Sequence, residues 1–413
     1  MKKGSTPPAT PPSSSSSATK AKAELPLPEI AEPSPPIKLV AAAAVSAIAT
    51  VCIVSKVLEQ VTSNSVPPFD PNGERYDQST FAGRFCRMIL ACDPLLLLHS
   101  EEETRRCRAL VDDRARIIAE ARGVAIEVGI KDDATTTTLT DLERSVHRTL
   151  WEAHRISCSS IHPDTLESIP HPFRMSGYVP FNGPICVSMV ASSSTPAILF
   201  WSFMNQSHNA LVNYSNRNAS SSCTMETLIQ SYVVAVGSAL AVAFGLATFI
   251  KKRYDPTRAR QLMRFVAFPS AVVASSLNCY IVRSPEIKDG VSLHDENGNN
   301  VLPEGERSKI AAAAGVQSTT LSRAVLQAPV YFLPPFLMAN LPPLKMLLAK
   351  SPHLSVPIAT YLVLVSFGLG LPATVAIFPQ NAEVAAGEVE ERFQSLKDGN
   401  GKIYEKFYYN KGL

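Results

Sequence analysis

The sequence is short of charge for its length. Its 413 residues include 39 lysines and arginines and 36 aspartates and glutamates, a charged fraction of 18%, against about 25% in a typical soluble domain. We therefore expect a large part of the chain to avoid water. The apolar fraction of 46% excludes disorder for most of the chain. The net charge of +3 is too small for a nucleic-acid-binding protein, which needs a dense basic surface.

The sequence also lacks the common motifs of metal sites and of catalysis. Its eight cysteines include no Cys-x-x-Cys pair, which argues against a zinc site and a disulfide framework and favours free thiols in a reducing compartment. There is no P-loop, no His-Glu-x-x-His and no Gly-x-Ser-x-Gly. We therefore predict no enzymatic activity, no cofactor and no metal.

Two segments match chemical motifs only formally. Residues 368–373 fit a dinucleotide fingerprint, but they lie inside an apolar run with Pro372 where the helix should start. Residues 295–306 place oxygen ligands at calcium-loop positions, yet Asn300 replaces the glycine that the sharp turn requires. We interpret the first as a membrane segment and the second as a solvated loop.

The first 68 residues divide into a polar arm and an apolar segment. Residues 1–36 hold nine prolines and seven serines, and the basic residues before Glu24 loosely resemble an organelle presequence. Residues 39–54 form an apolar run slightly shorter than the ~20 residues that span a bilayer. We predict a disordered arm followed by a segment with three open interpretations: a cleaved targeting segment, an extra membrane anchor or a buried helix.

Residues 69–172 have the pattern of helices with one wet face. Ser100 and Glu103 form a capping box, and Leu142, Val146 and Leu150 recur at helical spacing. We predict an amphipathic helical region that packs together or lies on a membrane surface.

Beyond residue 172 the chain contains long, weakly charged runs of about the length of a bilayer span. Residues 178–191 are shorter and include two prolines, which favours a half-helix or re-entrant segment. The predicted fold is all-α: a multi-span helical membrane protein of about five transmembrane helices, with a carrier body at 173–378 and a C-terminal tail at 379–413. The predicted spans are 195–214, 228–250, 265–282, 324–341 and 357–378.

Charge differs between the loops. Basic residues dominate the loops 251–264 and 342–356, whereas the loop 283–323 and the tail are rich in acids. The two basic loops fall on one side of the predicted body, and the positive-inside rule makes that side the matrix or cytosol equivalent.

The first predicted span carries a stripe of neutral polar side chains. These residues lie three or four apart and fall within about 80° of a helix. Neutral amides facing lipid are costly, so we expect the stripe to face protein or a wet cavity, and we favour a substrate-binding role over helix–helix adhesion. His208 lies off the stripe and is interpreted as a packed histidine. The stripe comprises Ser202, Asn205, Asn209, Asn213 and Asn216.

Prolines interrupt several predicted spans, and each removes a helix hydrogen bond. Such breaks either expose backbone groups to a transported solute or only bend the helix, and the pattern leaves both alternatives open. The prolines are Pro269, Pro329, Pro334, Pro335 and Pro372.

Several motifs, in order, resemble the sideroflexin family over about residues 69–413. They are Arg75–Phe81, His162–Thr165, Trp201–Arg217, Asp295–Asn299 and Asn410–Leu413. The resemblance implies a multi-pass carrier of the mitochondrial inner membrane, usually described with five spans. It further implies transport of serine and other small neutral amino acids such as alanine or cysteine, which feeds one-carbon metabolism. The family was earlier linked to tricarboxylates and to iron.

One motif departs from the family pattern. The tetrad His162, Pro163, Asp164 and Thr165 is usually followed by Gly-Glu in sideroflexins, but here Leu166 comes next, which puts any tight turn in doubt. We weigh a gate or proton relay against a proline-stiffened turn and favour the turn.

The residues also bear on the substrate. A tricarboxylate would need arginine or lysine inside the membrane, yet Arg217, Arg264, Arg283 and Arg323 all sit at the ends of predicted spans. Neutral amides suit a zwitterion better. Our leading hypothesis is a secondary transporter of small neutral amino acids, serine first. The alternatives are a membrane scaffold that affects iron or respiratory complexes without solute flux, and a citrate carrier.

Overall fold

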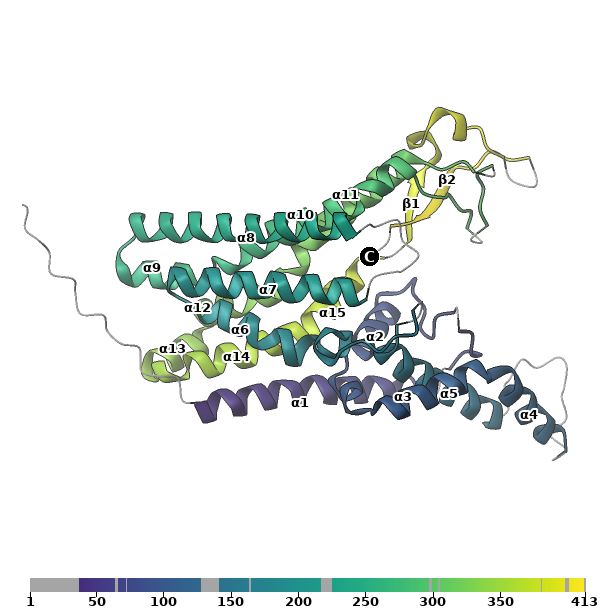
Figure 1. The fold of residues 1–413 in the computed structure, drawn as a ribbon, viewed down its shortest axis with the longest axis horizontal. Coiled ribbons are helices and arrows are strands. Elements are labelled where there is room, and N and C mark those ends of the chain that lie inside the picture. The colour runs from purple at the N-terminus through teal and green to yellow at the C-terminus, as the bar shows by residue number, and fades with distance from the viewer. Residues whose placement is uncertain are drawn as a thin grey trace, which may run out of the picture. The chain divides into compact units, whose positions relative to one another are not determined.

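The computed structural model describes most of the chain after residue 36, and within these ranges it is almost entirely helical (Figure 1). This confirms the predicted all-α, multi-span class. The predicted arm at 1–36 lies outside the described residues. The described ranges are 37–63, 66–71, 73–127, 141–162, 165–216, 225–296, 299–303, 305–379, 381–397 and 401–411.

The N-terminal helices pack around a small apolar core. The backbone N–H of Glu103 donates to Ser100 Oγ at 3.2 Å, so the predicted helix start at Ser100 is confirmed. Val111, Leu150 and Trp151 form the buried centre between these helices. The elements are α1 (Ile37–Val61), α2 (Phe81–Ala91), η1 (Pro94–Leu98), α3 (Glu101–Asp112), α4 (Arg114–Glu127) and α5 (Asp141–Ser160).

The body is a helix bundle interrupted by short π-helical segments. Its elements are η2 (His171–Phe173), η3 (Met175–Gly177), η4 (Tyr178–Asn182), α6 (Gly183–Ala191), α7 (Thr195–Ser215), α8 (Met225–Arg253), α9 (Pro256–Met263), α10 (Ala267–Asp289), α11 (Lys309–Leu326), η5 (Ala328–Phe332), α12 (Leu333–Asn340), α13 (Pro342–Lys350), η6 (Pro352–Leu354), α14 (Ser355–Val365), η7 (Ser366–Gly370) and α15 (Leu371–Ile377). The π-helical segments are η4, η5 and η7.

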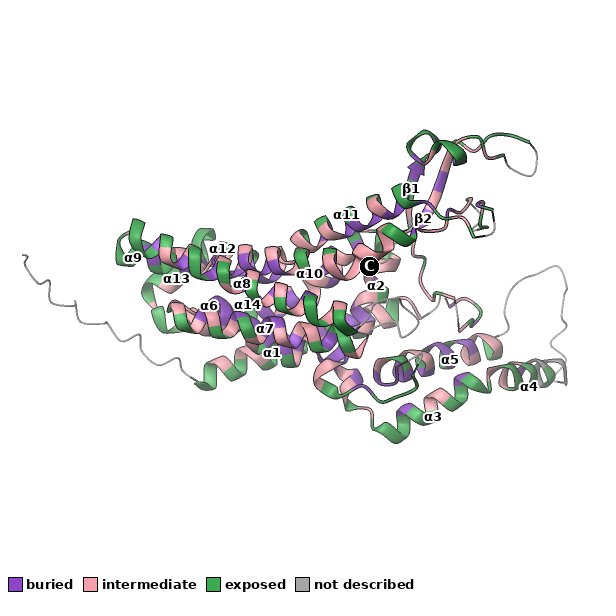
Figure 2. Cartoon of the chain, turned by 45° about the horizontal axis from the view of Figure 1, so that its top comes forward, coloured by how far each residue is buried: buried purple, intermediate pink, exposed green. Residues whose placement is uncertain are grey.

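Small residues set the packing of α8 in the bundle. Four buried alanines on α8, spaced four residues apart, begin at Ala235 and end at Ala247. Ser270 of α10 donates a hydrogen bond to the Ala239 carbonyl at 2.8 Å. Small side chains let backbones approach closely, as in membrane helix pairs. The opposite face of α8 is apolar and exposed, as a lipid-facing surface requires, and Val233 on it is 60% accessible. Figure 2 shows buried and exposed residues alternating along the helices of the bundle.

Four helical stretches are long and apolar enough to cross a membrane: 37–61, 225–253, 256–289 and 352–377. A fifth is a pair, 309–340 and 342–350, bent by 74°. The set lacks the predicted span at α7, because the amides and hydroxyls of α7 lower its mean hydropathy. It also includes 37–61, which was not among the five predicted spans. Since α7 packs along α8 and its 21 residues are about 31 Å long, we regard it as a helix at the depth of the spans, with Phe200 and Phe203 exposed on its outer face.

The two basic loops lie at the same end of the bundle, as predicted. Arg264 at the end of α9 donates to Ser355 Oγ at the start of α14, at 3.3 Å. At the other end, α10 continues to Asp289 and α11 begins at Lys309. The connection is therefore shorter than the predicted loop at 283–323.

The C-terminal residues fold against the connection between α10 and α11. Strand β1 (Asn381–Ala385) pairs antiparallel with β2 (Lys406–Asn410), and Phe407 and Leu293 are fully buried between them and the connection. Glu390 accepts hydrogen bonds from Ser308 Oγ at 2.7 Å and from the Lys309 backbone at 2.6 Å. Burial alone would raise the pKa of Glu390, but these hydrogen bonds lower it overall. The strands are too short for the sequence pattern to predict.

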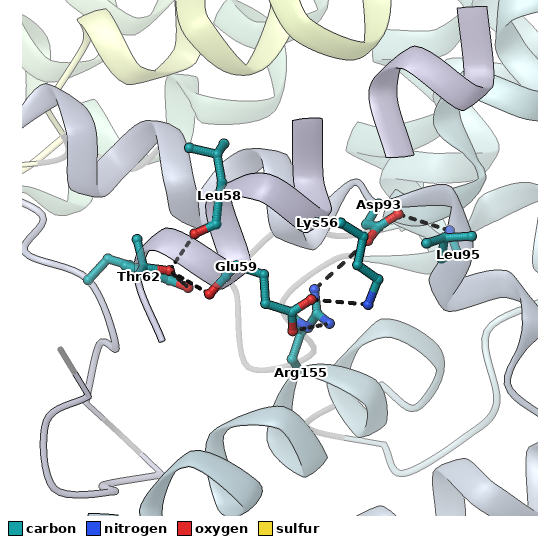
Figure 3. Close-up of polar contacts among 8 residues, drawn as sticks. Lys56, Leu58, Glu59, Thr62, Asp93, Leu95 and Arg155 are labelled. Atoms are coloured by element: carbon teal, nitrogen blue, oxygen red, sulfur yellow. Dashed lines mark hydrogen bonds and ion pairs between the residues drawn. The ribbon is translucent and has the colours of Figure 1, made fainter. Parts of the chain in front are cut away.

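Helix α1 contacts the rest of the fold in its middle and near its C-terminus. Its buried residues Ala47, Val51 and Ser55 face the bundle, where α1 packs against α14. Near its C-terminus Glu59 pairs with Arg155 of α5 at 3.0 Å, and Arg155 lies 4.0 Å from Asp93 (Figure 3). Most of α1 is nevertheless exposed, since Val45 is 68% and Ile53 is 63% accessible, so residues 39–54 do not form a buried helix in the described chain. The targeting-segment and anchor interpretations stay predictions. Burial raises the pKa of Asp93.

Candidate functional site

The predicted polar stripe of α7 is buried in the bundle at its N-terminal end and becomes exposed toward its C-terminal end. Ser202 and Asn205 are completely buried, Asn209 is half-buried and Asn213 is exposed. The structure therefore brings together Ser202, Asn205 and Asn209. It places Asn213 on the surface.

Asn205 lies at the centre of a buried polar cluster. The Tyr331 hydroxyl of η5 donates to Asn205 Oδ1 at 3.0 Å. The Cys186 sulfur of α6 lies 3.2 Å from the Tyr331 hydroxyl and 3.9 Å from Asn205 Oδ1. All three side chains are buried and neutral, so the cluster links three separate segments of the body through uncharged hydrogen bonds.

Asn209 extends this cluster by one helical turn. Its Oδ1 accepts hydrogen bonds from the Tyr178 hydroxyl at 3.1 Å and from Asn182 Nδ2 at 3.3 Å. Asn182 is 1% exposed, and its Oδ1 accepts no hydrogen bond within the described part of the chain; the same holds for the hydroxyl of Ser202. Buried polar atoms normally have partners, so these two oxygens are exceptions. We refer to Asn182, Cys186, Asn205, Asn209 and Tyr331 as the amide cluster.

The three π-helical segments converge beside the amide cluster. Segment η4 supplies Tyr178 and Asn182, and η5 supplies Tyr331. Segment η7 supplies Phe367, whose ring lies 4.8 Å from that of Tyr178. Single π-helical turns inside α-helices occur frequently at functional sites. They widen the helix locally and free backbone groups from the regular hydrogen-bond pattern.

The sequence did not identify Tyr178, Asn182, Cys186 or Tyr331 as site residues. The positions of the prolines in the sequence could have indicated three of them, Tyr178, Asn182 and Tyr331. Pro180 lies within η4 and Pro329 within η5, close to the tyrosines and Asn182. Cys186 had no such signal, because an isolated cysteine in an apolar run is most often a packing residue.

The remaining polar residues of α7 have structural contacts. Asn216 Nδ2 donates to the carbonyls of Phe173 at 2.7 Å and Val212 at 2.8 Å, which closes the end of α7. His208 Nε2 lies 3.1 Å from the Pro172 carbonyl, and its ring packs 6.0 Å from that of Phe173. These are the contacts of packed side chains.

His162 and Thr165 are the described residues of the tetrad, and they are joined by hydrogen bonds after α5. His162 Nδ1 accepts a hydrogen bond from the Thr165 backbone at 3.2 Å, and the Leu166 backbone donates to the His162 carbonyl at 3.0 Å. Pro163 and Asp164 lie outside the described residues. Leu166 has φ 58°, the left-handed conformation that favours glycine. The departure from the family pattern thus falls where a glycine would fit best.

Replacing Leu166 with glycine should stabilise the protein. A side chain in this conformation costs about 1–3 kcal/mol, and the greater freedom of glycine in the unfolded chain offsets about 0.4–1 kcal/mol. Because Leu166 is 56% exposed, little packing is lost, and we expect a net gain of about 0.5–1 kcal/mol. Thermal unfolding in detergent measures it. Leu166→Ala, which keeps a Cβ, serves as the control, and an equal gain for alanine would contradict the strain argument.

Among the residues that the structure describes, no group of three His, Cys, Asp or Glu side chains is placed to hold a metal ion. The seven described cysteines are free thiols. The chemistry of the amide cluster is therefore hydrogen bonding by neutral groups.

Comparison with known proteins identifies one family. A family model described as Sideroflexins matches residues 70–413. Sideroflexin-5 of Homo sapiens is 34% identical over 346 residues, which cover 83% of this chain and 94% of the relative. Sideroflexin of Dictyostelium discoideum is 32% identical over 356 residues, and Sideroflexin-1 of Homo sapiens is 33% identical over 353 residues; they cover 86% and 85% of this chain and 100% of each relative. No solved structure gives a significant match.

Proposed function

Because this chain belongs to the sideroflexin family, whose members are generally transporters rather than enzymes, we propose that it is a secondary transporter of small neutral amino acids. Serine is the first candidate substrate, and the mitochondrial inner membrane is the proposed location. Such transport would feed one-carbon metabolism. The observation that carries the proposal is the amide cluster, a set of hydrogen-bonded neutral groups buried among the helices of a multi-pass body.

The cluster offers groups of the right kind for a zwitterion. The buried oxygens of Asn182 and Ser202 can accept hydrogen bonds from an ammonium group or from the hydroxyl of serine. Asn209 is half-buried, so this end of the cluster lies nearer the surface than Asn205 does. Broken helices around a site are typical of secondary transporters, in which one part of the bundle moves against another.

A citrate carrier is the second candidate, and one sequence argument against it needs correction. Arg283 lies inside α10, and Arg323, in the last turn of α11, lies within the longer helical stretch 309–340 that continues through η5 and α12. Arg283 pairs with Glu286 at 2.6 Å, which leaves Arg323 as the candidate for binding an anion. A single arginine can pair with the one carboxylate of an amino acid but not with all three carboxylates of citrate. We therefore retain the neutral amino acid as the proposed substrate.

Uptake into proteoliposomes tests the proposal. Purified full-length protein should take up labelled serine, and unlabelled alanine or cysteine should compete while citrate does not. Uptake of labelled citrate with no serine uptake would favour the tricarboxylate alternative. Folded, inserted protein that moves none of these solutes would favour a scaffold role.

A further inference from the structure

We propose that Arg323 binds the carboxylate of the transported amino acid at the entrance to the amide cluster. This inference rests on the proposed function and assigns the one cationic contact to a site whose other members are neutral. Three features of Arg323 lead to it: its place on α11, the lack of a counter-ion among the described residues, and the nearby buried acceptors that have no hydrogen-bond donor there.

Arg323 lies on the side of its helix that leads to the amide cluster. Helix α11 continues into η5, and Arg323, Gln327 and Tyr331 follow at intervals of four residues, which places them along one side. The Tyr331 backbone N–H donates to the Gln327 carbonyl at 3.0 Å, so the path is helical between them. Tyr331 reaches Asn205 at the far end of this side.

Arg323 also lies toward the Asn209 end of the cluster along the helix axes. Thr195 at the start of α7 contacts Lys251 at the end of the bundle with the basic loops, so Asn209 lies further toward the C-terminal strands than Asn205 does. From Tyr331 to Arg323 the helix rises about 12 Å, at 1.5 Å per residue. Arg323 therefore lies beyond Asn209 on the side of the C-terminal strands, where α11 begins.

Arg323 is half-buried and makes no ion pair or hydrogen bond within the described ranges. The neighbouring Arg283 differs, since it binds Glu286 and donates to Thr319 at 2.8 Å. A partly buried cation without a counter-ion is unfavourable, and arginines inside membrane proteins commonly mark the path of a solute or ion. A carboxylate satisfies the guanidinium through two parallel hydrogen bonds.

The groups beyond Arg323 complement the rest of an amino acid. Asn182 Oδ1 is a buried acceptor with no partner in the described chain, and acceptors of this kind suit an ammonium group. A substrate held by its carboxylate at Arg323 would direct its ammonium group and side chain toward the neutral amides. A small uncharged side chain fits that surrounding better than a second carboxylate does.

Substrate analogues test the assignment in the unmodified protein. L-Serine and L-serinamide differ only in that a neutral amide replaces the carboxylate. We expect serine to inhibit labelled-serine uptake at a concentration at least about tenfold lower than serinamide does, because serinamide cannot form the charge-assisted pair. Equal inhibition by the two compounds would overturn the proposal.

Variants of Arg323 complete the test. Arg323→Gln should raise the KM for serine at least about tenfold and remove the preference for serine over serinamide, and Arg323→Lys should recover part of both. Arg106→Gln removes an arginine from the exposed face of α3 and should change neither. An Arg323→Gln protein with unchanged KM and preference would contradict the role of Arg323. Absence of serine uptake by the unmodified protein would instead contradict the proposed function.

Discussion

Leucine in place of Asn209 should reduce labelled-serine uptake by at least about a hundredfold, as loss of a few charge-assisted or buried hydrogen bonds does. Asn209 Oδ1 accepts from both Tyr178 and Asn182. The substitution removes the oxygen that accepts both hydrogen bonds and leaves the Tyr178 hydroxyl and the Asn182 amide without this acceptor. Initial rates of uptake into proteoliposomes at equal protein content measure the effect.

Asn213→Leu is the matched control for this experiment. The same change is made on the same helix, one turn away, but Asn213 is exposed and forms no part of the amide cluster. We expect it to keep more than half of the uptake. Equal loss in both variants would indicate that the amides serve only to hold helices together, and equal retention would show that Asn209 is not needed for transport.

Alanine in place of Gly368 should loosen α1 from the bundle. A Cβ built on Gly368 would lie 2.3 Å from Val51 Cγ2, well inside the distance of any normal contact. Val51 is 1% exposed and branched at Cβ, so it has little freedom to move aside. Overpacking of this kind costs about 1–3 kcal/mol. A lower apparent Tm in detergent, followed by a dye that reacts with newly exposed cysteines, is the expected result.

Two further variants separate this contact from a general effect of losing a helical glycine. Gly245 of α8 has open space around its Cβ position, so Gly245→Ala should be neutral or stabilise by about 0.5–1 kcal/mol. In a protein that already carries Val51→Ala, Gly368→Ala should lower the stability little, because alanine at position 51 leaves room for the new methyl group. If Gly368→Ala lowered the stability of the Val51→Ala protein as much as that of the unmodified protein, the contact with Val51 would not be the cause.

Helical periodicity and apolar runs were sufficient to predict the fold class. The run at 228–250 became α8, and the capping pair at Ser100 became the start of α3. These signals are local, so the sequence carries them directly. Helix α7 has a lower hydropathy than the spans because of its amides and hydroxyls. Neighbouring helices cover some of these side chains, such as Ser202 and Asn205, and hydropathy alone does not describe those contacts.

The candidate site could be predicted only in part. The stripe pointed to Asn205 and Asn209, but Asn213 belongs to the same periodicity and is exposed, since the bundle covers only part of α7. Tyr331 lies far along the chain from Asn205 and meets it through the tertiary fold. Arg323 was placed at a span end because apolar content alone does not show that α11 begins at Lys309.

Binding of serine at the amide cluster is the central claim, and a ligand-dependent shift in thermal stability tests it most directly. At a serine concentration of 100 times the dissociation constant, binding should stabilise the unmodified protein by about 2.7 kcal/mol and raise its Tm. We predict the same shift for Asn213→Leu and none for Asn209→Leu. A shift in Asn209→Leu as large as that of the unmodified protein would contradict binding at this site.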